Sequence, residues 1–372
     1  MIENFDKILQ AISPLNSRQL QLLPEDIQDL SHQMTDNRGE RRLGYMNESV
    51  QLTAYSRYFV WWNLIRLSRL FTNLPAKAFP KDNCFCMDLG SGPLTVVISL
   101  WLSRPELRSK KLVWYCLDLS NNSLKLGEDI YLSIAAKTPE FTPWKIIKVK
   151  GSFGTHINEK CDFITCANMF NEIDQTNDMP PEFQTKKYFD QLLEYSTEQT
   201  KYLLIEPGFP KSARTLSLLR ERFINEQKQI LSPCTHTENC PMNGFNAYTG
   251  SSCKWCNFAF STENAPSALR NLSTDAHLQK DRAVLSFISV ISDSKKQSNK
   301  ENELTVRITS DPLKLSRNHT GFYACSKIGL LLLEFCSESN HSSGDELTIE
   351  LKTAIEKLYV DSKTGYKKII LR

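Results

Sequence analysis

The feature that most constrains the fold is an alternation of short apolar runs and helical segments that begins near residue 83. The apolar runs read as strands, and they cover Asn83–Asp88, Leu112–Asp118, Trp144–Lys150, Cys161–Ala167 and Tyr202–Glu206. Helices are predicted over Pro93–Ser103, Lys186–Ser196 and Ser212–Glu226, and another is predicted to run through Ala136 with Ser120 as its N-cap. Repeated strand–helix units of this spacing predict an α/β fold, in which a doubly wound, mostly parallel, Rossmann-like sheet carries helices on both faces.

The ends of the chain break this alternation, so we expect three parts. Residues 1–75 predict a helical N-terminal extension, with Pro24 in the first turn of one helix and a single amphipathic helix over Val50–Phe71. Residues 76–293 form the predicted α/β domain, which contains a Cys-rich insertion at 228–280. Residues 304–372 show short alternating apolar runs and predict a small β-rich unit.

Composition narrows the class of protein. Hydrophobic residues make up 41% and charged residues 23% of the 372 residues, as in ordinary globular proteins. The N-terminal residues lack the apolar run of a secretory signal, and no apolar stretch is long enough to cross a bilayer, so we expect a cytoplasmic protein without membrane contact. The net charge of +3 is too small to indicate nucleic-acid binding by itself.

Arginines before the aromatic helix give one local signal for RNA. Arg38, Arg41 and Arg42 precede the Tyr- and Trp-rich segment Val50–Phe71. Arginine beside aromatic rings can bind phosphates and stack on bases. The alternative is a solvated arginine face next to a helix whose aromatic side chains pack in the core. We keep the three arginines as candidate RNA contacts and leave both interpretations open.

A glycine turn follows the first predicted strand. It contains Asp88, Gly90, Ser91 and Gly92, and Asp118 ends the second strand. Glycines let the backbone approach a ligand closely, and the helix that follows offers free N–H groups. A carboxylate at the end of the second strand can accept hydrogen bonds from both ribose hydroxyls of an adenosine ligand. The third glycine of a dehydrogenase fingerprint is absent, and a purely structural turn is the alternative.

This combination of strand, D-x-G-x-G turn, helix, strand and acid resembles the S-adenosylmethionine methyltransferase superfamily. The resemblance implies that Asp88 supports the loop and the amino-acid end of S-adenosylmethionine, and that Asp118 binds the ribose. It also implies that the end of the fourth strand faces the methyl donor and the acceptor. Asn168, Asn171 and Glu172 are therefore candidate catalytic residues that would orient an acceptor; the alternative is that they cap the next helix.

Cysteines crowd into one short segment. Cys234, Cys240, Cys253 and Cys256 lie close together in the sequence, and no secretory signal accompanies them. This crowding indicates a metal site rather than disulfides. Four thiolates suit zinc or an iron–sulfur cluster, and His236 could replace one of them.

The whole chain resembles the methyltransferase-like assembly factors of the small ribosomal subunit, which are known from mitochondria and have bacterial relatives. The matching pieces are Thr35–Tyr45, Asp88–Thr95, Glu206-Pro207-Gly208, the PC-x-H, CP and WC-x-F motifs of the cysteine segment, Asp281–Val290, and Cys325 four residues before Gly329. The resemblance implies a 4Fe–4S cluster held by Cys234, Cys240, Cys256 and Cys325. It differs from the local pattern, which favours Cys253 over Cys325.

The sequence departs from that family at several positions. Thr235 and Asn257 stand where Pro and His are usual, and the expected Trp-Gly-Asp near the C-terminus is missing. The implied role is action on the small-subunit precursor and its rRNA, as a monomer. We expect a methyltransferase for this rRNA; the alternatives are a non-catalytic RNA-binding assembly factor and a small-molecule methyltransferase with a zinc site.

Overall fold

The computed structural model describes residues 1–35, 45–173, 179–248, 250, 253–292, 302–316, 318–351 and 354–371. Arg38, Arg41 and Arg42 lie outside these residues. The chain divides into two compact units, each described here by itself. Unit 1 comprises Met1–Met179, Asp190–Leu203 and Phe260–Ala283, and unit 2 comprises Pro180–Phe189, Leu204–Ala259 and Val284–Arg372.

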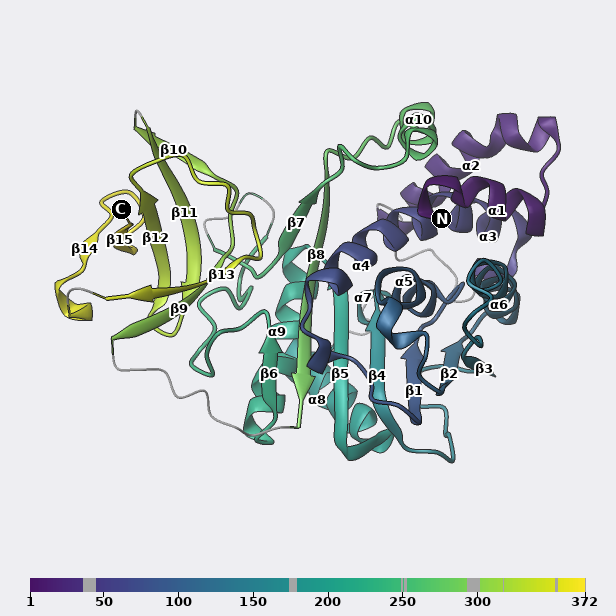
Figure 1. Cartoon of the computed structure of the whole chain (residues 1–372), viewed down its shortest axis with the longest axis horizontal. Helices are drawn as coiled ribbons and strands as arrows, with labels where there is room; N and C mark the ends of the chain where they lie inside the picture. Colours follow the sequence, from purple (N-terminus) through teal and green to yellow (C-terminus); the bar gives the residue numbers. More distant parts are fainter. Residues whose placement is uncertain are drawn as a thin grey trace. The chain divides into compact units, whose positions relative to one another are not determined.

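A parallel sheet forms the centre of unit 1 (Figure 1). Strand β1 (Cys84–Leu89) lies between β2 (Leu112–Asp118) and β4 (Cys161–Ala167), and β3 (Lys145–Lys150) pairs with the other edge of β2. The order β3-β2-β1-β4 reverses direction at β1, which creates the switch point where open α/β sheets bind ligands. The mostly parallel α/β sheet is therefore confirmed.

The helices α5 (Thr95–Ser103) and α6 (Asn121–Ala135) follow β1 and β2. Ser120 caps α6 as predicted, because its hydroxyl oxygen accepts a hydrogen bond from the Ser123 N–H at 3.1 Å. Between helices and sheet lies an aromatic core, in which the Trp101 and Trp144 rings meet edge to face with centroids 5.0 Å apart. The short elements η6 (Pro105–Leu107) and α7 (Phe170–Ile173) complete this region.

The N-terminal extension is helical, as predicted. It consists of η1 (Ile2–Asn4), α1 (Phe5–Ile12), α2 (Ser17–Thr35), η3 (Tyr45–Asn47), α3 (Ser49–Ala54), the π-helix η4 (Tyr55–Val60), α4 (Trp61–Asn73) and η5 (Ala76–Ala78). The helix α10 (Ser267–Asp275) also belongs to unit 1, and its Ser273 hydroxyl accepts a hydrogen bond from the Trp62 indole at 3.2 Å. Of the helices in the described ranges, none is both long and apolar enough to cross a lipid bilayer.

The prediction that Pro24 opens a helix is wrong. Helix α2 begins at Ser17, and Pro24 lies inside it. Asn16 and Gln19 explain the earlier start, because each side-chain oxygen accepts a hydrogen bond from the other residue's N–H at 3.0 Å. This reciprocal pair satisfies the first free N–H groups of the helix in the manner of a capping box.

Unit 2 contains the end of strand β5 (Ser196–Pro207), which continues from unit 1. It also contains the beginning of α8 (Pro181–Glu194), and α9 (Pro210–Asn225), β6 (Gln229–Ser232), most of β8 (Arg282–Ile291) and the beginning of β7 (Phe258–Ser261). Strand β8 pairs antiparallel with β6 and also pairs with β7. The predicted insertion at 228–280 therefore contains two strands that pair with β8, and the cysteine segment connects them.

The C-terminal part of unit 2 is a separate sheet, as predicted for a β-rich unit (Figure 1). Its strands are β9 (Glu303–Ile308), β10 (Leu313–Ser316), β11 (His319–Ser326), β12 (Gly329–Phe335), β13 (Glu346–Glu350), β14 (Tyr359–Val360) and β15 (Lys367–Leu371), with η8 (Ile355–Lys357) before β14. They pair in the order β13-β9-β11-β12-β15-β14, and β10 pairs with β11. Leu304, Val306, Ala324, Leu331 and Leu333 are buried in its core.

Candidate cofactor pocket and cysteine cluster

The glycine turn between β1 and α5 adopts a backbone that favours glycine. Gly90 and Gly92 have φ angles of +65° and +49°. A Cβ atom at Gly90 would lie 2.9 Å from the Cβ of Met169, so the turn and the segment after β4 are in close contact. The Ser91 hydroxyl donates a hydrogen bond to the Asp88 carbonyl oxygen at 2.7 Å. The turn is therefore fixed both locally and from β4.

Asp88 is buried at the end of β1. Its Oδ1 accepts a hydrogen bond from the Thr165 hydroxyl at 2.7 Å, whereas no described residue hydrogen-bonds its Oδ2. Burial raises the pKa of this carboxyl from 3.8 to about 7. A buried carboxyl oxygen without a partner is uncommon in folded proteins and is typical of ligand sites.

Asp118 ends β2 and faces the same turn. Its Oδ2 accepts a hydrogen bond from the Gly92 N–H at 2.9 Å, and its Oδ1 accepts one from the Ser120 N–H at 2.8 Å. Burial raises the pKa of Asp118, and these two backbone donors oppose that effect. Each carboxylate oxygen has a second lone pair, so this fixed side chain keeps acceptor capacity for a ligand.

The residues after β4 lie at the same turn through Met169, and one of the three predicted catalytic residues, Asn168, meets a side chain that the sequence did not suggest. Asn168 has a φ of +61°, and its Oδ1 accepts a hydrogen bond from Nη2 of Arg66 at 3.0 Å. Arg66 comes from α4, in the N-terminal extension. Asn171 and Glu172 lie half-buried in α7.

Sequence reasoning also missed Met46. Its carbonyl oxygen accepts a hydrogen bond from the Ser120 hydroxyl at 3.0 Å, and its sulfur lies 3.8 Å from the Ser123 hydroxyl oxygen. A Cβ at Gly92 would lie 4.0 Å from the Met46 methyl carbon. The extension therefore contacts both the glycine turn and the start of α6, and no local sequence signal predicts this contact.

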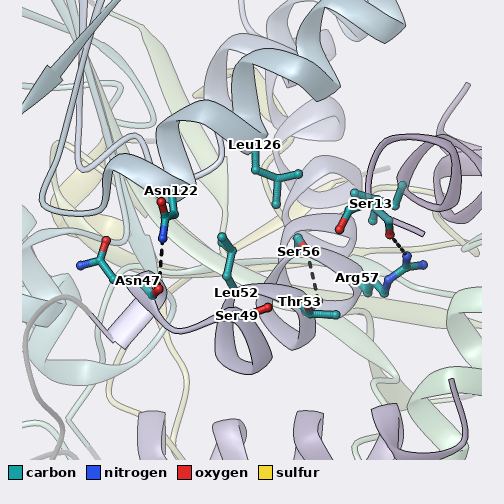
Figure 2. Close-up of a pocket in the computed structure, with 10 residues that line it drawn as sticks. Ser13, Asn47, Ser49, Leu52, Thr53, Ser56, Arg57, Asn122 and Leu126 are labelled. Carbon is teal, nitrogen blue, oxygen red and sulfur yellow. Dashed lines mark hydrogen bonds between the residues drawn. The ribbon is translucent and has the colours of Figure 1, made fainter. Parts of the chain in front are cut away.

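A cavity of about 250 Å³ lies beside this contact, between the extension and α6. Figure 2 shows Asn47, Leu52, Arg57 and Asn122 around it. Asn122 donates a hydrogen bond to the Asn47 carbonyl oxygen at 3.1 Å, and the buried Arg57 donates to the Ser13 carbonyl oxygen at 2.7 Å. The cavity is mostly polar at its two ends and apolar at Leu52.

Unit 2 brings together four of the five candidate cysteines. Cys234 follows β6, Cys240 lies in the insertion, Cys256 precedes β7 and Cys325 lies in β11. Burial raises the pKa of Cys256, and the charges of the other three thiolates raise it further. Cys253 is exposed. Cys256 therefore lies within electrostatic range of Cys234, Cys240 and Cys325, the three cysteines that the family resemblance groups with it.

Arg220 of α9 is the main unexpected residue of this cluster. Its side chain is buried, with 2% exposed. Its Nε donates a hydrogen bond to the Cys234 sulfur at 3.1 Å, and its Nη2 donates to the carbonyl oxygens of His236 and Glu238. Burial acts to lower the pKa of Arg220, but the nearby thiolates outweigh it and the net pKa is raised. The guanidinium thus supplies a fixed positive charge to the cysteines.

The imidazole of His236 lies beside Cys325 in this cluster. Its Nε2 is 3.6 Å from the Cys325 sulfur. Burial, together with the charge of Arg220, lowers the pKa of His236 to about 4, so the imidazole is neutral at physiological pH. Among the described residues, no group of three or more His, Cys, Asp or Glu side chains is arranged to hold a metal ion.

Known structures give weak likenesses to this chain. The ribosomal protein L11 methylase of Lactobacillus delbrueckii has 14% identity and a TM-score of 0.31, with 47% of this chain and 72% of that chain covered. A putative RNA methyltransferase of Pyrococcus horikoshii has 12% identity and a TM-score of 0.33, with 61% and 83% covered. Magnesium protoporphyrin IX methyltransferase of Synechocystis has 12% identity and a TM-score of 0.34, with 66% and 95% covered.

No curated protein matches the chain in sequence. One family does match, over residues 79–331, and it is described as "Mitochondrial small ribosomal subunit Rsm22". This range holds the glycine turn, the end of β4, the cysteine segment and Cys325, and it covers more than half of the chain. The chain therefore belongs to the Rsm22 family of the mitochondrial small ribosomal subunit.

Proposed function

We propose that this protein binds S-adenosylmethionine in unit 1 and methylates small-subunit rRNA during ribosome assembly. The observation that carries the proposal is the pair of carboxyl groups at the β1–β4 switch point. Asp118 is held toward the glycine turn by two backbone donors, and Asp88 has a buried oxygen without a described partner. S-adenosylmethionine would supply an electrophilic methyl group there. Asn168, Asn171 and Glu172 would position the acceptor, and positioning can supply most of the rate enhancement.

A second function, a non-catalytic assembly factor, is favoured by a different observation. The Asn168 amide oxygen is already engaged by Arg66, and Met46 lies against the glycine turn. These contacts use an oxygen that would otherwise be available to orient an acceptor, so they suit a pocket that contributes to folding or sensing. In this version the protein binds the precursor through RNA contacts, among them Arg38, Arg41 and Arg42.

The proposal includes a 4Fe–4S cluster held by Cys234, Cys240, Cys256 and Cys325. Support comes from the donor set and from Arg220, a buried cation whose nearest acceptors include a cysteine sulfur. A buried charge is stable only when it is paired. Four thiolates with a bound cluster carry the negative charge that would pair with Arg220, whereas four neutral thiols would not.

The test uses small-subunit precursors from cells that lack the protein. The anaerobically purified protein is incubated with these precursors and methyl-labelled S-adenosylmethionine, and label is counted in the rRNA. We expect label with the wild type and none with Asp118→Ala, whereas the control Asp129→Ala, on the exposed surface of α6, should retain it. Label that persists in Asp118→Ala would contradict the assignment of this pocket.

The second function gives another outcome in the same experiment. A non-catalytic factor would leave the rRNA unlabelled but would still co-sediment with the precursor at low salt, with binding that weakens as salt rises. Calorimetry then compares S-adenosylmethionine binding by the wild type and by Asp118→Ala. Weaker binding by the variant would assign the ligand to this pocket. Iron and acid-labile sulfide in the purified protein distinguish a cluster from zinc. Our expectation of a cytoplasmic protein belongs to the same proposal.

A further inference from the structure

A small cavity in unit 2 is used by neither proposed site. It has a volume of about 250 Å³ and contains three aromatic rings, those of Trp255, Tyr323 and Tyr366, together with Lys254 and Asn257. Its volume is below the usual range for pockets that take drug-sized ligands. Its size and lining instead suit one planar, polar ring system.

The three rings are held in place by the fold. The rings of Tyr323 and Tyr366 meet edge to face, with centroids 5.8 Å apart and planes at 88°. The Trp255 indole donates a hydrogen bond to the Gly208 carbonyl oxygen at 3.0 Å. Rings fixed in this way lose little conformational freedom when a ligand stacks on them.

The polar groups of the cavity add contacts for the edge of a nucleobase and for the negative charge of a phosphate. The Asn257 side-chain N–H donates to the Trp255 carbonyl oxygen at 3.1 Å, which orients the amide and leaves its oxygen as an acceptor. Lys254 is exposed, so its ammonium can reach a phosphate from the rim. Aromatic faces, an oriented amide and a rim lysine are the groups that bind single-stranded RNA.

The cavity also lies against the cysteine cluster. Trp255 precedes Cys256, and the Cys256 N–H donates to the carbonyl oxygen of Met242, which also lines the cavity, at 3.0 Å. Tyr323 and Cys325 are two residues apart on β11 and therefore share a face of the sheet. A cluster bound by these cysteines would hold two walls of the cavity in place.

We propose that this cavity binds one unstacked nucleobase of single-stranded RNA, with Lys254 on the adjacent phosphate. The proposal rests on the RNA-binding role given above and adds a base-specific contact to it. The test is fluorescence anisotropy with the full-length, cluster-loaded protein. The probes are a single-stranded RNA of about 12 nucleotides and an abasic strand of the same length.

The wild type should bind the RNA roughly 5- to 100-fold more tightly than the abasic strand, because stacking contributes to binding only when bases are present. In Tyr366→Ala and Tyr366→Leu, the ratio of the affinity for RNA to the affinity for the abasic strand should fall close to one. Tyr366→Phe keeps the ring and should keep the wild-type ratio. The matched control is Tyr359→Ala, since Tyr359 is 74% exposed and does not line the cavity. Lys254→Ala should weaken binding of both strands equally and lower the salt dependence.

A wild-type ratio of one, or a ratio unchanged in both Tyr366→Ala and Tyr366→Leu, would overturn the base pocket. Using two Tyr366 variants guards against loss of folding in one of them, which thermal unfolding would reveal. Failure of the base pocket is distinguishable from failure of the proposed function. A protein that still methylates the rRNA or co-sediments with the precursor, but binds RNA and the abasic strand equally, has the proposed function without this base pocket.

Discussion

The Nε of Arg220 lies 3.1 Å from the sulfur of Cys234 and donates a hydrogen bond to it. The same guanidinium binds the carbonyl oxygens of His236 and Glu238. One side chain of α9 therefore fixes the first part of the cysteine segment and carries the positive charge that faces it. This arrangement makes Arg220 a positioning residue for the proposed cluster.

Replacing Arg220 should reduce cluster occupancy. Arg220→Met removes hydrogen bonds from a charged donor, each worth roughly 1.5–3 kcal/mol, and leaves buried carbonyl oxygens without donors. We expect less iron and sulfide per chain and a lower Tm. Arg222→Met is the matched control, because Arg222 lies on the same helix and its guanidinium donates a hydrogen bond to the Glu182 carbonyl oxygen. Equal iron content in the two variants would show that Arg220 does not position the cluster.

Two cysteine variants decide the fourth ligand of the cluster. Cys325→Ser should lose iron and sulfide, because Cys325 lies within electrostatic range of Cys234 and Cys240. Cys253→Ser should keep the wild-type content, because Cys253 is exposed. Metal and sulfide analysis after anaerobic purification measures both. The reverse pattern would assign the fourth position to Cys253.

Asp88 should give unit 1 a distinctive pH dependence. Its pKa is raised to about 7 in the folded protein from 3.8. Between about pH 4 and pH 7 the folded state therefore holds more protons at Asp88 than the unfolded state, so its contribution to stability falls as pH rises, by up to about 1.4 kcal/mol per pH unit. Above about pH 7 the contribution is constant.

Asp88→Asn removes this titration. In urea unfolding, the stability of the variant relative to wild type should rise from about pH 4 to about pH 7 and then level off. The change with pH is the measurement, because the variant also alters the hydrogen bond with Thr165 and so shifts the overall level. Parallel pH profiles for variant and wild type would mean that Asp88 is charged throughout.

Close packing at Gly90 can be separated from backbone strain. Gly365→Ala places Ala at a φ of +72° with open space around the new Cβ, so it should cost only the left-handed conformation, about 1 kcal/mol. Gly90→Ala has a similar φ but brings its Cβ to 2.9 Å from the Met169 Cβ, an atom that cannot rotate away. We expect it to lose roughly 1–3 kcal/mol more in urea unfolding. Equal losses would mean that the Met169 segment moves freely.

Local sequence signals predicted the parallel sheet well. Strands β2 and β4 have the predicted limits, because each is an apolar run between polar residues, and the Ser120 cap follows from its position before a helix. Pro24 was misleading because the helix start is set by the Asn16–Gln19 pair, about two turns earlier. The π-helix η4 inside the segment Val50–Phe71 also has no signature in an amphipathic pattern.

The site contacts that were missed join residues far apart in the sequence. Arg66 and Asn168 are 102 residues apart, and Met46 and Ser120 are 74 apart. Single-residue propensities and motif spacing report on neighbours along the chain, so they found Asp88, Asp118 and the cysteines. They could not find the extension residues that meet them.

The position of Cys325 in β11 has a consequence for biosynthesis. Ribosomes extend a chain at about 5–20 residues per second, and domains fold as they emerge. Cys234, Cys240 and Cys256 are therefore made several seconds before Cys325, and a chain interrupted before β11 would carry only three of the four ligands of the proposed cluster. Completion of the set marks a chain whose C-terminal sheet has been translated through β11.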